Sequence, residues 1–287
     1  MSETAGGSEV FAPGLMRDGV ALVTGGGTGL GKATALELAR CGASVTIAGR
    51  REDVLRDAAE EISVGAAGGG GGGVDWVSAD VREREEGERL VRTVLDRHGQ
   101  LDVLVNNAGG QYFAPAEMIA AKGWRAVWKL NVGGMLNMSQ AAFELAFEAG
   151  GGGSIVNVTL SPHHGMPGMA HSGAARATVE SLTRELARRW LDSGIIVTAV
   201  AAGHFETEVL AKYPDSVRAG TARSVPLGRM GSAEEHAWLV ALLASPLGHI
   251  FNGSTVTLDG ARDNWAGPWP PPGLADESGE VPVEARS

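Results

Sequence analysis

A strand, a glycine-rich turn and the start of a helix follow one another near the beginning of the chain. The apolar run at 20–23 leads into glycines, and residues 33–40 then have the pattern of an amphipathic helix. Glycine permits the tight turn and lets backbone N–H groups approach a phosphate, while the helix dipole favours an anion at the helix N-terminus. This order of elements predicts a dinucleotide-binding site. Its predicted pyrophosphate-binding residues are Thr24, Gly25, Thr28, Gly29, Leu30 and Gly31.

Apolar strand-like runs alternate with helix-length amphipathic segments as far as residue 260. Strands are predicted near 19–24, 43–48, 74–79, 102–106, 153–158, 195–200 and 255–258. Helices are predicted near 29–41, 51–63, 82–98, 116–149 (one helix or two), 172–193 and 232–244. Such alternation predicts an α/β fold of Rossmann type, a doubly wound parallel sheet of about seven strands with helices on both faces. One domain is expected over 1–262, with a substrate loop near 203–230 and a C-terminal extension at 263–287.

Charge and cysteine content exclude several classes of function. The net charge of −10 argues against a surface for nucleic acid or anionic membranes. Cys41 is the only cysteine, so an intrachain disulfide and a cysteine-based zinc site are excluded. The first seventeen residues lack the apolar core of a signal peptide, and no apolar run has the length of a membrane span. We therefore expect a cytoplasmic protein with a small-molecule substrate and no metal.

Further motifs, in the right order, resemble the short-chain dehydrogenase/reductase family over residues 19–262. They are Ala48-Gly49-Arg50-Arg51, Asp80-Val81, Asn106-Asn107-Ala108-Gly109 and Lys129-Leu130-Asn131-Val132. Members that bind NAD usually carry an acidic residue after the second strand, whereas arginine neutralises a 2′-phosphate. Arg50 and Arg51 at this point predict NADP in preference to NAD.

The same resemblance implies roles for other residues. Asp80 and Val81 correspond to the adenine contact, and Asn107, Ala108 and Gly109 to the motif beneath the cofactor. Asn131 corresponds to the helix asparagine that holds a water of the proton relay. Gly203 is expected to meet the nicotinamide amide through its backbone, and Thr207 to contact the phosphates.

The catalytic segment departs from the family pattern. Members ordinarily carry a serine, followed by tyrosine and lysine spaced Y-x-x-x-K on one helix. Alignment on residues 179–183 puts Ser172 at the tyrosine, Arg176 at the lysine and Thr159, thirteen residues before Ser172, at the serine. Ser172 and Arg176 are four residues apart and share one helix face. Serine is a poor acid near neutral pH, so the standard alcohol–ketone chemistry is not predicted.

One branch of the family resembles this segment. Residues 171–176, 12–15, 106–117 and 122–124 are similar to the peroxisomal trans-2-enoyl-CoA reductases and the neighbouring 2,4-dienoyl-CoA reductases. The resemblance implies NADPH-dependent reduction of the trans-2 double bond of an enoyl-CoA thioester. Negative charge then develops on the thioester oxygen, where hydrogen-bond donors are needed. Thr159 and Ser161 are the predicted donors, and Asn131, Ser172 and Arg176 complete the predicted catalytic set.

The proton donor and two other functions stay open. Candidates for the donor are Tyr112, Tyr213, His163, His164 and His171. The chain is alternatively a carbonyl or alcohol oxidoreductase acting on an apolar substrate such as a terpenoid, or a catalytically silent NADP(H)-binding protein. Family members usually assemble through the two long helices, here 124–149 and 172–193, which implies a homodimer or homotetramer.

Overall fold

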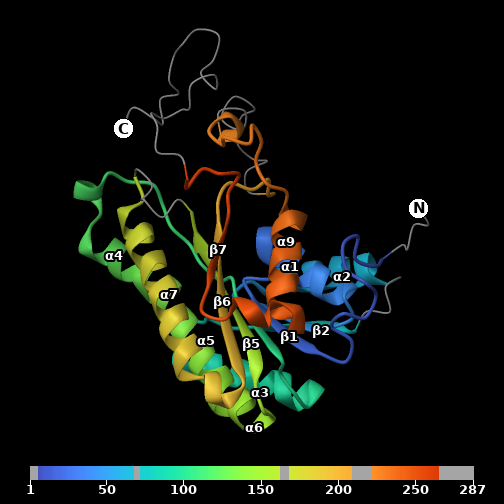
Figure 1. Ribbon diagram of the computed structural model, residues 1–287. Helices are drawn as coiled ribbons and strands as arrows, with labels where there is room; N and C mark the ends of the chain where they lie inside the picture. Colours follow the sequence, from blue (N-terminus) through green and yellow to red (C-terminus); the bar gives the residue numbers. More distant parts are fainter. Residues whose placement is uncertain (1–5, 68–71, 162–167, 209–220, 265–287) are drawn as a thin grey trace.

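Seven parallel strands form one sheet in this computed structural model, which describes residues 6–67, 72–161, 168–208 and 221–264. The order across the sheet is β3-β2-β1-β4-β5-β6-β7 (Figure 1). The strands are β1 (Val20–Thr24), β2 (Ser44–Gly49), β3 (Val74–Ser78), β4 (Val103–Asn106), β5 (Gly153–Leu160), β6 (Ile195–Ala202) and β7 (Thr255–Leu258). The predicted Rossmann-type fold is confirmed.

Helices cover both faces of the sheet. α1, α2 and α9 pack on one face, and α3, α5 and α7 pack on the other (Figure 1). The helices are α1 (Gly29–Arg40), α2 (Glu52–Ala66), α3 (Arg84–His98), α4 (Ala121–Trp128), α5 (Gly134–Ala142), α6 (Glu148–Gly150), α7 (Ala170–Arg189) and α9 (Ala233–Ala244). Within the described ranges, no helix is long and apolar enough to cross a membrane.

The sequence of β1 is apolar at four successive positions, Val20 to Val23, rather than at alternate ones. Ala21 and Val23 belong to the core beneath α1, α2 and α9, while Val20 and Leu22 belong to the core beneath α3, α5 and α7. Successive side chains of a strand point to opposite faces, and helices cover both faces here. A continuous apolar run therefore fits a central strand of this sheet.

The helical region predicted over 116–149 is divided by turns of π-helix. A short 3-10 turn at Ala116–Met118 and α4 come first, and π-helical turns at Lys129–Gly133 and Phe143–Phe147 flank α5. The side chain of Asn131 donates to the carbonyl of Val127 at 2.8 Å. That carbonyl is the one that the backbone N–H of residue 131 takes in an α-helix, so the side chain competes with the regular ladder.

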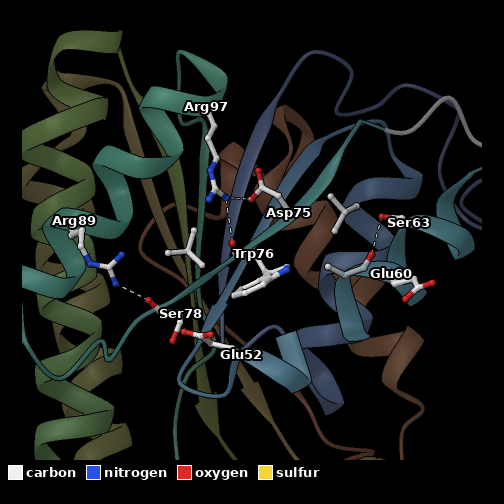
Figure 2. Close-up of a pocket in the computed structure, with 11 residues that line it drawn as sticks. Glu52, Glu60, Ser63, Asp75, Trp76, Ser78, Arg89 and Arg97 are labelled. Carbon is white, nitrogen blue, oxygen red and sulfur yellow. Dashed lines mark hydrogen bonds and ion pairs between the residues drawn. The ribbon is translucent and has the colours of Figure 1, made fainter. Parts of the chain in front are cut away.

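Two arginines of α3 cover the outer edge of the sheet at β3 (Figure 2). Backbone groups of residues 73 and 79 bond β2, so those of Trp76 and Ser78 turn outward. Arg97 Nη1 donates to the Trp76 carbonyl at 3.2 Å, and Arg89 Nη2 donates to the Ser78 carbonyl at 2.6 Å. A hollow of about 890 Å³ lies here between α2 and α3, away from the glycine-rich turn.

A buried histidine lies between α9 and α1. His236 has no exposed surface, its Nδ1 lies 3.5 Å from Thr34 Oγ1, and its ring meets that of Phe205 edge-on with centroids 5.6 Å apart. Burial disfavours the charged imidazole and lowers the pKa of His236 to about 4. The neutral ring is therefore the form that the fold accommodates.

The His236 side chain predicts a loss of stability in mild acid. Between the unfolded histidine pKa near 6.5 and the folded value near 4, the unfolded chain binds a proton that the folded chain does not. The free energy of unfolding therefore falls by about 2 kcal/mol from pH 7 to pH 5 through this group. We expect His236→Gln to show a smaller drop in Tm over this range than the wild type. The exposed His249→Gln is the control, and identical pH profiles for the wild type and His236→Gln would contradict the assignment.

Candidate active site

A cleft of about 530 Å³ opens where the carboxyl ends of β1, β2, β4 and β5 meet. Strand order reverses between β1 and β4, and ligands of open α/β sheets bind at such a switch point. Most of the predicted site residues line this cleft. They are Gly25, Thr28, Leu30, Gly31, Arg50, Arg51, Asp80, Val81, Asn107, Ala108, Gly109, Thr159, Arg176 and Gly203. Thr24, Gly29, Asn131, Ser161, Ser172 and Thr207 do not line it.

The glycine-rich turn has the backbone that its sequence predicts. Gly25 and Gly29 have φ of +67° and +53°, a region that side chains with a Cβ rarely adopt. Gly31 is confined by contact instead, because a Cβ there would lie 2.3 Å from both Asn107 Nδ2 and the Gly25 carbonyl oxygen. Thr207 lies beside Gly29, since its Cγ2 would be 3.8 Å from a Cβ at that glycine. The predicted phosphate-binding residues therefore surround the N-terminus of α1.

Thr24 and Asn107 join the ends of β1 and β4. The Thr24 hydroxyl donates to the Val105 carbonyl at 3.2 Å and accepts the backbone N–H groups of Asn107 and Ala108, each at 3.1 Å. Asn107 Nδ2 donates to the carbonyls of Thr24 and Gly25 at 3.0 and 3.2 Å. These bonds fix the floor of the cleft. Thr24 does not line the cleft itself, and it positions the backbone of residues 107 and 108, which do.

A second amide network lies deeper in the protein and was missed by the sequence analysis. Asn106 Nδ2 donates to Ser139 Oγ at 3.0 Å and to Asn157 Oδ1 at 2.9 Å, and Asn157 Nδ2 donates to Thr183 Oγ1 at 2.9 Å. Every member is buried. The network links β4, β5, α5 and α7, and its signal in the sequence is a polar residue inside an apolar strand.

Arginines gather at the end of the cleft formed by β2 and β3. Arg50 and Arg51 follow β2, and within the described ranges Arg50 makes no ion pair. Asp80, after β3, accepts from Arg82 Nε at 2.8 and 3.0 Å, and this contact holds the pKa of Asp80 below its usual value. The charge of Asp80 is thus balanced by Arg82, which leaves Arg50 available to an anion.

Arg176 lies beneath the opposite end of the cleft. Its Nη1 donates to the Val158 carbonyl at 2.6 Å, and a Cβ at Gly109 would lie 2.3 Å from its Nη2. Burial lowers the pKa of Arg176 to about 10, so the side chain stays a cation at neutral pH. No described residue accepts from its Nε. The guanidinium therefore offers an N–H donor to a ligand above Gly109.

The hydroxyl groups near Arg176 point to carboxylates. Thr159 Oγ1 donates to Glu180 Oε1 at 2.9 Å, and the Ser161 hydroxyl donates to Asp259 Oδ2. Ser172 is fully buried, and its hydroxyl has no partner among the described residues. The sequence analysis missed both carboxylates as hydroxyl partners. Asp259 directly follows β7, and this position is the signal that could have identified it.

Asn131 holds the loop that follows β4. Its Nδ2 donates to the Gly110 carbonyl at 2.9 Å, and its Oδ1 accepts the Gly110 N–H at 3.2 Å. The next residue, Gln111, lines the cleft, and its side chain makes no hydrogen bond with a described residue. Gln111 was not among the predicted site residues, because nothing in its local sequence distinguishes it from an ordinary loop residue.

The candidates for the proton donor differ in position. A Cβ at Gly123 would lie 1.9 Å from Tyr112 Oη, so this hydroxyl is turned toward α4 and away from the cleft. His171 is buried against the ring of Tyr112. His163, His164 and Tyr213 lie outside the described residues, as do part of the substrate loop and nearly all of the C-terminal extension.

A family model described as enoyl-(acyl carrier protein) reductase matches residues 25–261, most of the chain. The chain belongs to the short-chain dehydrogenase/reductase family. Members of this family are oxidoreductases that use a nicotinamide cofactor. The predicted family is confirmed, and the cleft between β1 and β4 is the place where its cofactor belongs.

Relatives in the family carry names of two kinds. A probable 2,4-dienoyl-CoA reductase of Bacillus subtilis (strain 168) is 35% identical, covering 87% of this chain and 97% of the relative. A cis-4-hydroxycyclohexanecarboxylate dehydrogenase of Sinomonas cyclohexanicum is 37% identical over 84% and 95%. Among solved structures, a citronellol catabolism dehydrogenase of Pseudomonas aeruginosa PAO1 is 38% identical, with a TM-score of 0.78 over 88% and 98%.

The residues of the cleft fit the cofactor of the family. The turn of Gly25 and Gly29 leads into the N-terminus of α1, where backbone N–H groups favour a phosphate, and the buried Nε of Arg176 has no partner among the described residues. Arg50 marks the other end, beside the adenosine position of Asp80. The distribution of charge matches a dinucleotide, with cationic groups at both ends of an otherwise small-residue floor.

Gly31→Ala is expected to weaken dinucleotide binding. The added Cβ meets the Gly25 carbonyl, which is backbone and cannot turn aside. Relief of the clash displaces the turn that presents its N–H groups to the phosphates, so we expect the affinity to fall about tenfold or more, equivalent to about 1.4 kcal/mol. NADPH and NADH titrations followed by fluorescence measure the loss for both cofactors. Gly73→Ala is the control, since a Cβ there meets nothing within 4 Å, and equal affinity for the two variants would contradict the packing argument.

Proposed function

We propose that the protein is an NADPH-dependent reductase of the double bond conjugated with an acyl-CoA thioester, the trans-2 bond of an enoyl-CoA. One observation carries the proposal. At the position of the family tyrosine stands Ser172, a buried hydroxyl, with the cation of Arg176 one turn further along α7. Reduction of a ketone requires an acid at the carbonyl oxygen, whereas reduction of an enoyl thioester requires hydrogen-bond donors there and a proton at carbon.

NADPH, when bound, supplies a hydride to the β-carbon, and a proton added at the α-carbon completes the saturated thioester. Arg176, at the position of the family lysine, would hold the nicotinamide ribose from beneath Gly109. Arg50 neutralises the 2′-phosphate at the far end of the cleft. Both arginines act by binding and orientation, which converts the hydride transfer to an effectively intramolecular step.

Gln111 and Thr159 are the donors for the thioester oxygen in this proposal. Both line the cleft, and the amide of Gln111 makes no hydrogen bond with a described residue. The Thr159 hydroxyl donates to Glu180, so it becomes a donor to the substrate only when it turns away from that carboxylate. Preorganised N–H and O–H donors aimed at a developing oxyanion lower the barrier more than any other contact of their size.

The proton for the α-carbon reaches the cleft through Thr159 and Glu180 in this proposal. The Thr159 hydroxyl, which bonds Glu180 Oε1, gives its proton to the α-carbon and takes one back from solvent along this hydrogen bond. Ser161 donates to Asp259 in a second pair of hydroxyl and carboxylate, and the Asp263 N–H also donates to Asp259 at 2.7 Å, but Ser161 does not line the cleft. Neither pair involves Tyr112, whose hydroxyl faces α4.

The names of the relatives support two readings of the substrate. The 2,4-dienoyl-CoA reductase of Bacillus subtilis favours a conjugated thioester. The hydroxycyclohexanecarboxylate and citronellol dehydrogenases favour the second candidate, an oxidoreductase acting on an apolar alcohol or its carbonyl product. The absence of a phenol from position 172 gives the thioester the greater weight.

The deciding assay follows NADPH oxidation with trans-2-enoyl-CoA thioesters of several chain lengths and with a 2,4-dienoyl-CoA. We expect oxidation that depends on the thioester, faster with NADPH than with NADH, and none with a saturated acyl-CoA. Turnover of an apolar alcohol or ketone in place of every thioester would establish the second candidate. Binding of NADPH with no turnover of either class would identify a silent cofactor-binding protein.

Arg50→Ala tests the choice of cofactor. Loss of a charge-assisted contact with the 2′-phosphate costs about 1.5 kcal/mol, so we expect the Kd of NADPH to rise about tenfold while that of NADH stays the same. Arg56→Ala is the matched control, because Arg56 is an exposed arginine of α2 that pairs with Asp57 and does not line the cleft. An equal rise for the two cofactors in Arg50→Ala would count against a 2′-phosphate at this position.

A further inference from the structure

The loop between β4 and α4 is held at two points beside the cleft. Asn131 bonds both backbone groups of Gly110, and the Ala114 N–H donates to the Gly168 carbonyl at 2.8 Å. Gln111 lies between these points, and its exposed side chain makes no hydrogen bond with a described residue. Tyr112, the next residue in the chain, lies between the same two points.

Aromatic contacts hold Tyr112. Its ring meets the ring of His171 edge-on, with centroids 4.5 Å apart and planes at 77°. His171 in turn meets Trp124 of α4 edge-on at 6.1 Å. Tyr112 Oη lies against Gly123, in the first turn of α4. Rings in this geometry attract one another, in addition to the hydrophobic gain from the area that they bury.

The burial of His171 is otherwise unexplained. It is 1% exposed, and neither ring nitrogen has a partner among the described residues. An imidazole left in this way is costly, because its polar atoms lose water without gaining a bond. Among the described residues, the ring contact with Tyr112 is the interaction that favours this buried position. His171 also directly precedes Ser172, so the contact joins the loop to the first turn of the catalytic helix.

We propose that Tyr112 is a positioning residue, and that its packing on His171 fixes Gln111 toward the cleft. The proposal rests on the proposed function for the role of Gln111 and adds the means by which that residue is held. Ordering a loop residue costs conformational entropy, and a loop without this contact would lose that entropy during each turnover. The ring contact meets this cost when the chain folds.

Tyr112→Ala and Tyr112→Phe test the contact. We expect Tyr112→Ala to lower kcat for the thioester about tenfold or more with little change in the Kd of NADPH. Tyr112→Phe keeps the ring and should keep most of the activity, although the hydroxyl is gone. Hydrogen exchange of residues 110–114 in the NADPH-bound protein should be faster in Tyr112→Ala only. Met118→Ala, an exposed apolar residue of the neighbouring 3-10 turn, is the control for exchange.

A double-mutant cycle with Gln111→Ala decides whether Tyr112 acts through Gln111. If it does, Tyr112→Ala adds little to the loss already caused by Gln111→Ala. Losses that multiply would overturn the proposal, and so would unchanged exchange at 110–114 in Tyr112→Ala. A wild-type protein that turns over no thioester would sink the proposed function instead, and the exchange measurement would still report on the contact between Tyr112 and His171.

Discussion

The site depends on the close approach of α1 to the loop after β4. Gly31 has no room for a side chain because the amide of Asn107 and the Gly25 carbonyl occupy that space. Asn107 in turn bonds the carbonyls at the end of β1. Backbone from two halves of the sheet is thereby brought within contact distance, and the cleft is the small space that remains above it. Every other cleft residue is arranged around this junction.

Contacts local in the sequence could be predicted, and those between distant residues could not. The turn around Gly25 and Gly29 and the apolar strand β1 follow from short patterns whose partners are a few residues away. The bond from Thr159 to Glu180 spans 21 residues, and the bond from Ser161 to Asp259 spans 98. Sequence alone suggested that both hydroxyls were donors to a substrate, because nothing local indicates which acceptor the fold brings to them.

Charge illustrates the difference between the whole chain and its site. A net charge of −10 excludes broad anion-binding surfaces, yet Arg50 and Arg176 lie at the two ends of one cleft. Arg82 balances the charge of Asp80 at the same end of the cleft as Arg50. Arg176 is half-buried, whereas Arg50 is exposed at the other end of the cleft. Charges this close to a ligand act at short range, so the net charge of the chain says little about the ligand that the cleft accepts. The phosphates of a dinucleotide fit this local pattern in an acidic protein.

The two edges of the sheet are not equivalent. Arg89 and Arg97 occupy carbonyls of β3 that a further strand would need, whereas β7 forms the opposite border. An edge strand with unpaired N–H and C=O groups can pair with a strand of another chain. Side chains that bond these groups make such pairing less favourable. A strand that added to the sheet at β3 would first have to displace Arg89 and Arg97 from the carbonyls of Ser78 and Trp76, so the two arginines protect this edge from pairing with another chain.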